Sequence, residues 1–315
     1  MKTDYLYTTV HNRVDDIQLE PDSSYIYCKS AEERSHFVGQ LISKNFKDVH
    51  FIQIEDVDTE KIKHLESNKE FFLKSSVNMF ELIGTYNSKK IYIDVTGIDN
   101  RVCAALIKNA IDYNDQGKSE KVIVVYAEPG LYDIKKFKTE SVFNNLAEKI
   151  DGIYPLPGFA TIFPHDEDDV SLIALLGFEG GRFSHMLETV QPPRGSVIPI
   201  IGVPGFRPEY PHVAYWGNRR PLEDTEAWRQ IKFAAANSLV EVYMLLTNIL
   251  SKKPTFKIKL APIGTKPHAI AAMLFAIKHP RIVELIYDNP KRKKARTEGM
   301  GNIIECLISE LIKNN

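Results

Sequence analysis

The fold is decided by one stretch of the sequence, which reads Phe256-Lys-Ile-Lys-Leu-Ala-Pro-Ile-Gly-Thr-Lys-Pro-His-Ala-Ile-Ala-Ala-Met-Leu-Phe275. Its first part is apolar and favours a strand, whereas its alanine-rich second part favours a helix. The turn between them contains Gly264, Thr265 and Lys266. Glycine permits a tight turn, threonine caps a helix, and the N–H groups of a first helical turn attract an anion. The stretch therefore predicts a strand, an anion-binding turn and a helix.

The same succession of strand, turn and helix is predicted four times along the chain. The fourth unit is completed by the β-prone run 281–287. The other three begin with strands at 24–28, 90–95 and 171–176, continue with helices ending near 45, 113 and 190, and close with strands at 48–54, 121–126 and 196–201. Strands that are apolar almost throughout are typical of parallel sheets covered on both faces. We therefore expect a doubly wound, mostly parallel, Rossmann-like α/β fold.

The length of 315 residues fits two such α/β halves. The proline- and glycine-containing segment 151–170, with the acidic run His165–Asp169, resembles a linker, so we place the halves at 1–160 and 161–315. Helices are expected at 222–250 and, at the C-terminus, at 300–313. Segment 203–220 is rich in proline and aromatic residues and is expected to be an irregular, ligand-facing loop.

Composition excludes several classes of function. The chain has 40 Lys and Arg against 41 Asp and Glu, which gives no overall attraction to nucleic acid or membrane. Its three cysteines are widely spaced and suggest neither disulfides nor a metal site, and neither a signal core nor a membrane-spanning run is present. We expect a cytoplasmic protein with no membrane partner, no metal and no bound cofactor.

Three of the predicted turns carry residues suited to binding phosphate. In parallel α/β sheets, ligands bind beyond the carboxyl ends of the strands, where such turns converge. Glycine allows the backbone to approach a ligand, and Lys and Arg complement negative charge. The candidate ligand-binding residues are Thr96, Gly97, Arg101, Gly177, Gly180, Gly181, Arg182, Gly264, Thr265, Lys266 and His268.

Two further features extend this candidate site. Tyr215, in segment 203–220, is a candidate to stack against a base. The basic run 291–296 follows a predicted strand end, and its charges suit the phosphates of an oligonucleotide as well as those of a small nucleotide. An aromatic segment of this kind also suits an interface with a second copy of the chain or with a partner subunit.

Three carboxylates at strand ends are candidates for catalysis. Asp94, Glu128 and Glu179 each follow or end a predicted strand, as groups that bind ribose or transfer protons often do. Their spacing does not select between a role in hydrolysis or transfer and a capping role in a turn.

The run Ala261-Pro-Ile-Gly-Thr-Lys-Pro-His268 resembles the signature of the CRISPR-associated Rossmann fold sensor family of bacterial defence. The resemblance covers this one motif and implies that Gly264, Thr265 and Lys266 contact a cyclic or linear oligonucleotide messenger. Three functions stay open from the sequence. They are a nucleotide-binding sensor, a hydrolase or transferase acting on nucleosides or nucleotides, and a structural subunit of a larger assembly.

Overall fold

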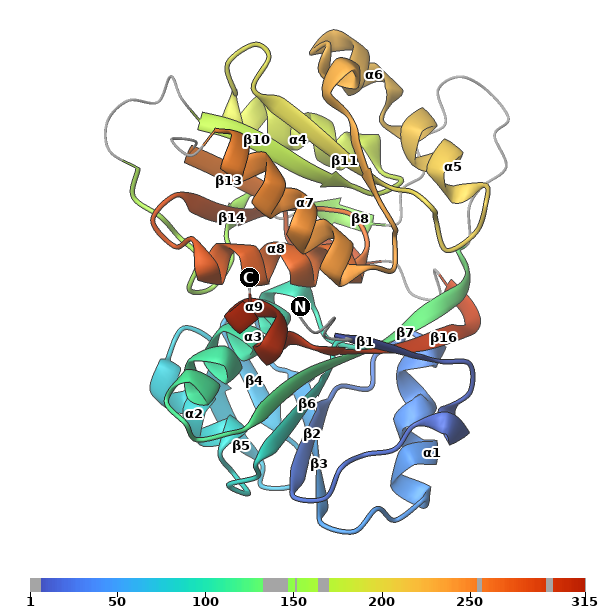
Figure 1. Cartoon of the computed structure of the whole chain (residues 1–315), viewed down its shortest axis with the longest axis vertical. Coiled ribbons are helices and arrows are strands. Elements are labelled where there is room, and N and C mark those ends of the chain that lie inside the picture. Colours follow the sequence, from blue (N-terminus) through green and yellow to red (C-terminus); the bar gives the residue numbers. More distant parts are fainter. Residues whose placement is uncertain are drawn as a thin grey trace, which may run out of the picture. The chain divides into compact units, whose positions relative to one another are not determined.

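The computed structural model describes residues 7–132, 147–150, 152–163, 170–253, 257–292 and 297–314. The chain divides into two compact units, one formed by 1–132 with 294–315 and the other by 133–293. The C-terminal segment therefore belongs to the same unit as the N-terminus, whereas the sequence suggested one continuous half after residue 160. Each unit contains one large mixed sheet with helices, so the chain is an α/β protein (Figure 1).

The sheet of the first unit has eight strands in the order β1-β16-β7-β6-β2-β3-β4-β5. Strands β3, β2, β6 and β7 are parallel, and the outer strands pair antiparallel. The strands are β1 (Thr8–His11), β2 (Ser23–Tyr27), β3 (Val49–Asp56), β4 (Lys61–His64), β5 (Lys69–Phe72), β6 (Lys90–Asp94), β7 (Lys121–Tyr132) and β16 (Thr297–Leu307). The helices are α1 (Val38–Ser43), α2 (Ser76–Ile83), α3 (Asn100–Asp115) and α9 (Ile308–Asn314), with 3-10 turns η1 (Val14–Asp16) and η2 (Glu33–Phe37).

The sheet of the second unit has six strands in the order β12-β11-β10-β13-β14-β9, and only β9 runs antiparallel among them. The strands are β9 (Tyr154–Pro155), β10 (Val170–Leu176), β11 (Val197–Gly202), β12 (Lys232–Ala234), β13 (Lys257–Pro262) and β14 (Val283–Tyr287). The helical segments are α4 (Gly180–Val190), α5 (Tyr210–Gly217), α6 (Arg219–Asp224), η4 (Ala227–Gln230), α7 (Leu239–Lys252) and α8 (Lys266–Lys278). A separate pair joins β8 (Ala147–Ile150) to β15 (Pro290–Arg292).

Helices cover both faces of this second sheet (Figure 1). On one face, Phe183 and Met186 of α4 pack with Leu172 and Ala174 of β10. On the other face α7 packs against α8, and α8 is buried from Lys266 through Ala276. A helix that is apolar almost all round is one that neighbours enclose, which explains the alanine-rich sequence.

The parallel strands of the two units are connected in the same way. The orders β3-β2-β6-β7 and β11-β10-β13-β14 are equivalent. In each, the strand that comes first along the chain is central, the second strand pairs on one side of it, and the third and fourth follow on the other side. The strand order therefore reverses between β2 and β6 in the first unit and between β10 and β13 in the second. The connecting loops at these points leave the sheet at the carboxyl ends of the strands.

Three predicted segments are wrong. The C-terminal helix is short, because 297–307 forms β16, whose apolar residues pair with both β1 and β7. The predicted helix 222–250 is interrupted by edge strand β12 before α7 begins at Leu239. Segment 203–220 is not an irregular loop, because α5 begins at Tyr210 and tolerates Pro211 in its first turn, where a backbone N–H group is not needed.

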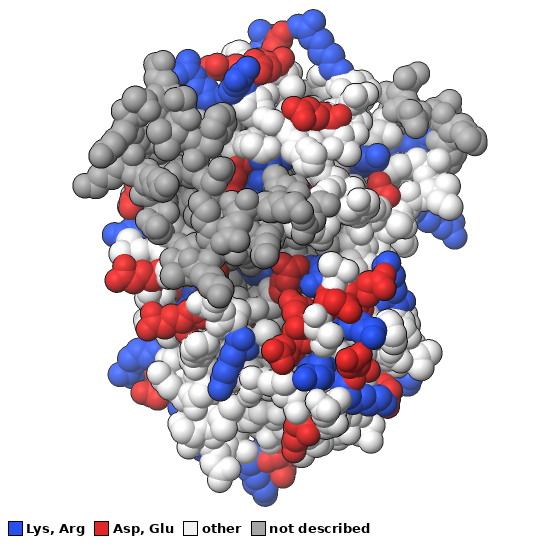
Figure 2. All heavy atoms as spheres, turned by 180° about the vertical axis from the view of Figure 1, so that it is seen from behind, with Lys and Arg blue, Asp and Glu red and all other residues white. Residues whose placement is uncertain are grey.

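The described surface is mixed in charge. On the face that Figure 2 displays, Lys and Arg side chains are interspersed with Asp and Glu. This agrees with the near-zero net charge of −1. Within the described ranges, no helix is long and apolar enough to cross a bilayer.

Candidate functional site

The second unit brings two of the predicted glycine turns together. Gly177 follows β10 and Gly264 follows β13, and these two strands are neighbours at the point where the strand order reverses. A Cβ on Gly177 would lie 2.9 Å from the carbonyl oxygen of Ile263, and one on Gly264 would lie 2.8 Å from that of Leu176. The two backbones are therefore in contact, and neither position has room for a side chain.

A second pair of glycines holds the start of α4 against the end of α5. A Cβ on Gly180 would lie 1.9 Å from the carbonyl oxygen of Gly217, and one on Gly217 would lie 2.2 Å from that of Phe178. The buried Asn218 fixes this contact, because its side-chain N–H group donates to the carbonyl of Gly177 at 2.7 Å. Gly180 is thus required for packing, a role that the sequence did not reveal.

The first turn of α4 also lies at this edge. Its N-cap residue, Glu179, makes no side-chain capping bond, and the exposed Gly181 has no atom within 4 Å of the position that a Cβ would occupy. The N–H groups of a first helical turn have no partner within the helix. The first turn of α4 is therefore a helix start without a side-chain cap, buried at Gly180 and exposed at Gly181.

The first turn of α8 is more nearly satisfied. Thr265 caps it, since its hydroxyl accepts from the amide of His268 at 3.4 Å and donates to the carbonyl of Ala236 at 2.7 Å. Pro267 has no N–H group. Lys266 is the first residue of α8 and is buried. This turn therefore offers an anion fewer amides than the sequence suggested, because that of His268 is bonded to Thr265 and Pro267 has none.

Arg182 forms a buried ion pair. Its Nε and Nη2 atoms donate to the two carboxylate oxygens of Asp288, each at 2.6 Å, and Nη1 donates to the carbonyl of Ile263 at 3.1 Å. The guanidinium also lies 5.6 Å from the ring centre of Tyr287, and Glu179 is 3.5 Å from Nη1. Burial alone would lower the pKa of Arg182, but the Asp288 carboxylate outweighs it and raises that pKa. The charge of Arg182 is thus used within the protein.

His268 is fully buried beside the same turn. Its Nε2 atom lies 3.0 Å from the carbonyl of Ala235, and its Nδ1 atom has no hydrogen-bond partner among the described residues. Burial lowers the pKa of His268 to about 4, against the opposing effect of the Ala235 carbonyl. The ring is therefore neutral at pH 7, and Nε2 carries the proton that it donates.

Tyr215 lies on α5 and is 43% exposed. Its neighbour Trp216 is 41% exposed and carries the guanidinium of Arg219 at 5.2 Å from its ring centre. Tyr210, in the first turn of the same helix, is buried and packs edge-on against Phe178 at 5.2 Å. Of these aromatic side chains, Tyr210 therefore belongs to the core, whereas Tyr215 and Trp216 lie at the surface.

Thr96, Gly97 and Arg101 lie in the first unit, on a different sheet from the turns described above. A Cβ on Gly97 would lie 2.0 Å from the carbonyl oxygen of Cys28, so Gly97 also marks a backbone contact where the strand order reverses. Arg101 donates to the carbonyl of Asp58 at 2.8 Å. The candidate cations therefore belong to two sheets rather than to the edge of one.

The carboxylates are also divided between the units. Asp94 is buried in the first unit, where it accepts from the amide of Thr96 at 3.0 Å and from the hydroxyl of Tyr25 at 3.3 Å. Burial raises the pKa of Asp94 to about 6, although both hydrogen bonds act to lower it. Glu128 is a buried residue of β7, also in the first unit, whereas Glu179 stands at the start of α4 in the second.

The two units share a buried arginine, although Arg34 was not among the candidate residues. Arg34 follows β2 as Arg182 follows β10, and its guanidinium lies 5.2 Å from the ring centre of Tyr126. It pairs with Glu32 at 2.9 Å and donates to the carbonyl of Ala127. A signal was present, because Tyr126-Ala-Glu-Pro129, within β7, and Tyr287-Asp-Asn-Pro290, at the end of β14, have the same spacing of Tyr and Pro on equivalent strands.

Two predicted features lie outside the described residues. They are the acidic run His165–Asp169 and the basic side chains of 291–296, of which only the backbone of residues 291 and 292 is described, in β15. In the described part of the chain, no group of three or more His, Cys, Asp or Glu side chains is placed to hold a metal ion. Comparison with known proteins adds no identity, because no family model matches the chain and no curated protein matches it significantly.

Proposed function

We propose that this protein binds a nucleotide or another phosphorylated small ligand at the carboxyl edge of the second sheet, between the turn 177–182 and the turn 263–266. The observation that carries the proposal is the backbone contact of Gly177 and Gly264 at the reversal of strand order between β10 and β13. Ligands of doubly wound, Rossmann-like sheets bind at such a reversal, because neighbouring connections leave toward opposite faces there.

The open first turn of α4 supports a phosphate as the group bound. The start of a helix attracts an anion through its amide N–H groups, and one such terminus contributes about 0.3–1 kcal/mol in total at an exposed site. Gly181 leaves room for close approach, and Lys266 begins the neighbouring helix. Since Arg182 is neutralised by Asp288, this proposal assigns the phosphate to the amides of α4 and gives Arg182 the task of holding the turn.

The distribution of carboxylates favours a binding protein over an enzyme. Asp94 and Glu128 belong to one unit and Glu179 to the other, and both oxygens of Asp94 accept hydrogen bonds from neighbouring residues. With the Gly-Thr-Lys turn at the same edge, we infer a sensor of a nucleotide messenger, as in the defence family that this motif resembles.

Calorimetric titration with mononucleotides and with short cyclic and linear oligonucleotides tests the proposal. Gly181→Val adds a side chain into the open space at the first turn of α4, where the proposal places the phosphate, so it should weaken binding at least about tenfold without disturbing the fold. Gly39→Val is the matched control, because Gly39 is also helical and also has nothing within 4 Å of its Cβ position. Equal affinity of the two variants for a confirmed ligand would show that the site lies elsewhere.

A further inference from the structure

A cavity lies in the second unit, at the opposite edge of the sheet from the proposed nucleotide site. Its volume is about 580 Å³. Ser171 is the second residue of β10, Ser196 directly precedes β11, and Lys232 begins β12, so the cavity lies at the amino ends of these strands. At 3.3 Å per residue, Ser171 and Gly177 are roughly 20 Å apart along β10. The two sites are therefore separate.

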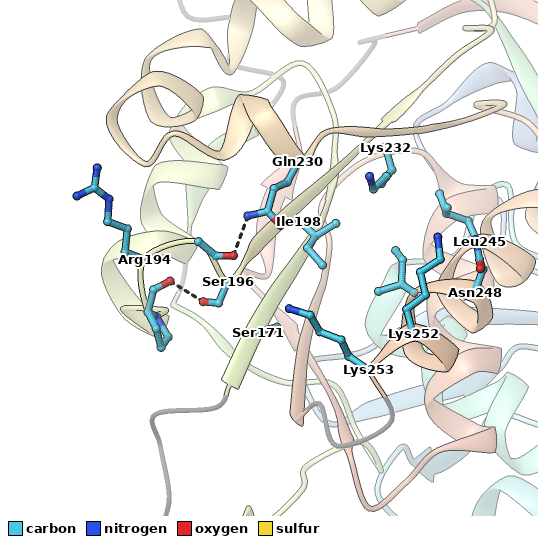
Figure 3. Close-up of a pocket in the computed structure, with 13 residues that line it drawn as sticks. Ser171, Arg194, Ser196, Ile198, Gln230, Lys232, Leu245, Asn248, Lys252 and Lys253 are labelled. Atoms are coloured by element: carbon cyan, nitrogen blue, oxygen red, sulfur yellow. Dashed lines mark hydrogen bonds between the residues drawn. The ribbon is translucent and has the colours of Figure 1, made fainter.

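Cationic side chains surround this cavity. Lys232, Lys252, Lys253 and Arg194 all line it, and none of its thirteen described lining residues is acidic. Figure 3 shows Lys253 extending from the end of α7 toward the sheet. Arg194 pairs with Glu226 outside the lining, whereas Lys232 and Lys252 have no ion-pair partner among the described residues. The rim of the cavity is therefore positive.

The end of α7 accounts for only part of this charge. A lysine in the last turn of a helix is favoured by the helix dipole, which explains Lys252. Lys232 is on an edge strand, where no dipole favours it, yet it faces the same hollow. A bound anion would offset the repulsion that remains among these solvent-exposed charges.

The floor of the cavity is apolar. Ile198 and Ile249 are each only 8% exposed, and Leu245 lies beside them in the lining. Asn248 and Gln230 add polar groups that can orient a ligand. The side-chain amide of Gln230 already donates to the carbonyl of Gly195 at 2.7 Å. A volume of this size lies within the range of small-molecule sites.

We propose that this cavity binds a small organic anion, a carboxylate or phosphate monoester attached to a compact apolar body. The acidic group contacts the ammonium groups of Lys232 and Lys252, and the apolar body covers Ile198 and Ile249. The proposal does not depend on the nucleotide site, since it uses neither glycine turn.

Four probes that share one ring system separate the two contributions. They are 2-naphthyl phosphate, 2-naphthoate, uncharged 2-naphthol, and inorganic phosphate without the ring. Titration calorimetry gives the affinities, and methyl NMR of labelled isoleucine reports contact with Ile198 and Ile249. We expect the two naphthyl anions to shift both methyl signals saturably, and to bind at least about tenfold more tightly than naphthol or phosphate alone.

Variants locate the charge contribution. Lys232→Ala with Lys252→Ala should weaken 2-naphthyl phosphate about tenfold, and the corresponding Lys→Arg pair should restore binding. Lys47→Ala with Lys89→Ala removes the same charge from exposed positions of the first unit and should leave affinity unchanged. Equal affinity of the two double alanine variants, binding without shifts at Ile198 and Ile249, or no binding of either anion would each overturn the proposal.

Discussion

Arg182 and Asp288 form a two-pronged ion pair, with both nitrogen–oxygen distances at 2.6 Å and the Asp288 side chain fully buried. The pair connects the first turn of α4 to the residue after β14. A carboxylate in such a place needs a cation, because an unpaired buried charge is strongly disfavoured. Arg182 therefore holds the first turn of α4 against the end of β14.

Arg182→Ala should lower the free energy of unfolding by about 3–5 kcal/mol, since it leaves Asp288 buried without its partner. Urea unfolding at pH 7 measures the change. The additional change Asp288→Ala should cost less in the Arg182→Ala background than in the wild type, because the unpaired charge is then gone. Arg220→Ala is the control, as its exposed pair with Asp224 should contribute less than about 1 kcal/mol. Similar losses for Arg182 and Arg220 would contradict the assigned role.

Much of the fold was predictable because apolar strands and capped helices are local signals. Strands β2, β6, β10, β11, β13 and β14 and helices α3, α4 and α8 all lie within a few residues of their predicted positions. The failures were long-range. The run 297–307 has apolar residues that also suit a helix, and only its pairing with β7 and β1 makes it a strand. Pairing of this kind depends on residues far away in the sequence.

Gly177→Ala and Gly264→Ala should each destabilise the protein by about 1–3 kcal/mol, because the new methyl group would meet a backbone carbonyl at 2.8–2.9 Å. Backbone on both sides leaves little freedom to relax. Gly181→Ala should be neutral or slightly stabilising, since its Cβ position is open and alanine favours a helix. Thermal unfolding of the three variants side by side gives the comparison, and a loss at Gly181 as large as at Gly264 would contradict it.

The candidate site was predictable only in part, and for a physical reason. The proximity of Gly177 and Gly264 was predictable, because each follows a strand and neighbouring parallel strands have their carboxyl ends at the same edge of the sheet. Whether a cation at that edge is available depends on its partner. Asp288 lies 106 residues from Arg182 in sequence, so nothing local to Arg182 indicated that its charge is used internally.

Thr265→Ala should lower stability by about 1–2 kcal/mol, since it removes both the cap of α8 and the 2.7 Å hydrogen bond to Ala236. Thr265→Ser keeps the hydroxyl and should recover most of the loss. In Thr189 the hydroxyl bonds back to its own helix at His185, so Thr189→Ala should have little effect in the same urea titration. If Ser at 265 were as harmful as Ala, the hydroxyl would not be the stabilising group.

Two buried groups should make stability depend on pH in opposite directions. The pKa of Asp94 is raised from 3.8 to about 6, so its stabilising contribution is complete below pH 3.8 and is lost as pH rises through about 6. The pKa of His268 is lowered from 6.5 to about 4, so its contribution is complete above pH 6.5 and is lost as pH falls through about 4. Each effect amounts to about 3 kcal/mol, at 1.36 kcal/mol for each unit of pKa.

Asp94→Asn and His268→Gln separate these effects. Relative to the wild type, Asp94→Asn should gain stability as pH rises from 4 to 6.5, because its side chain cannot ionise and can still bond to Thr96 and Tyr25. The stability of His268→Gln relative to the wild type should rise as pH falls over the same range. Only the wild type then loses stability, because its buried histidine ring stays neutral while that of the unfolded chain takes up a proton. Urea unfolding at half-unit steps of pH, followed by a probe in each unit, gives both slopes. Parallel slopes for the two variants would contradict the assignment, because the first group binds its proton more tightly in the folded state and the second more weakly.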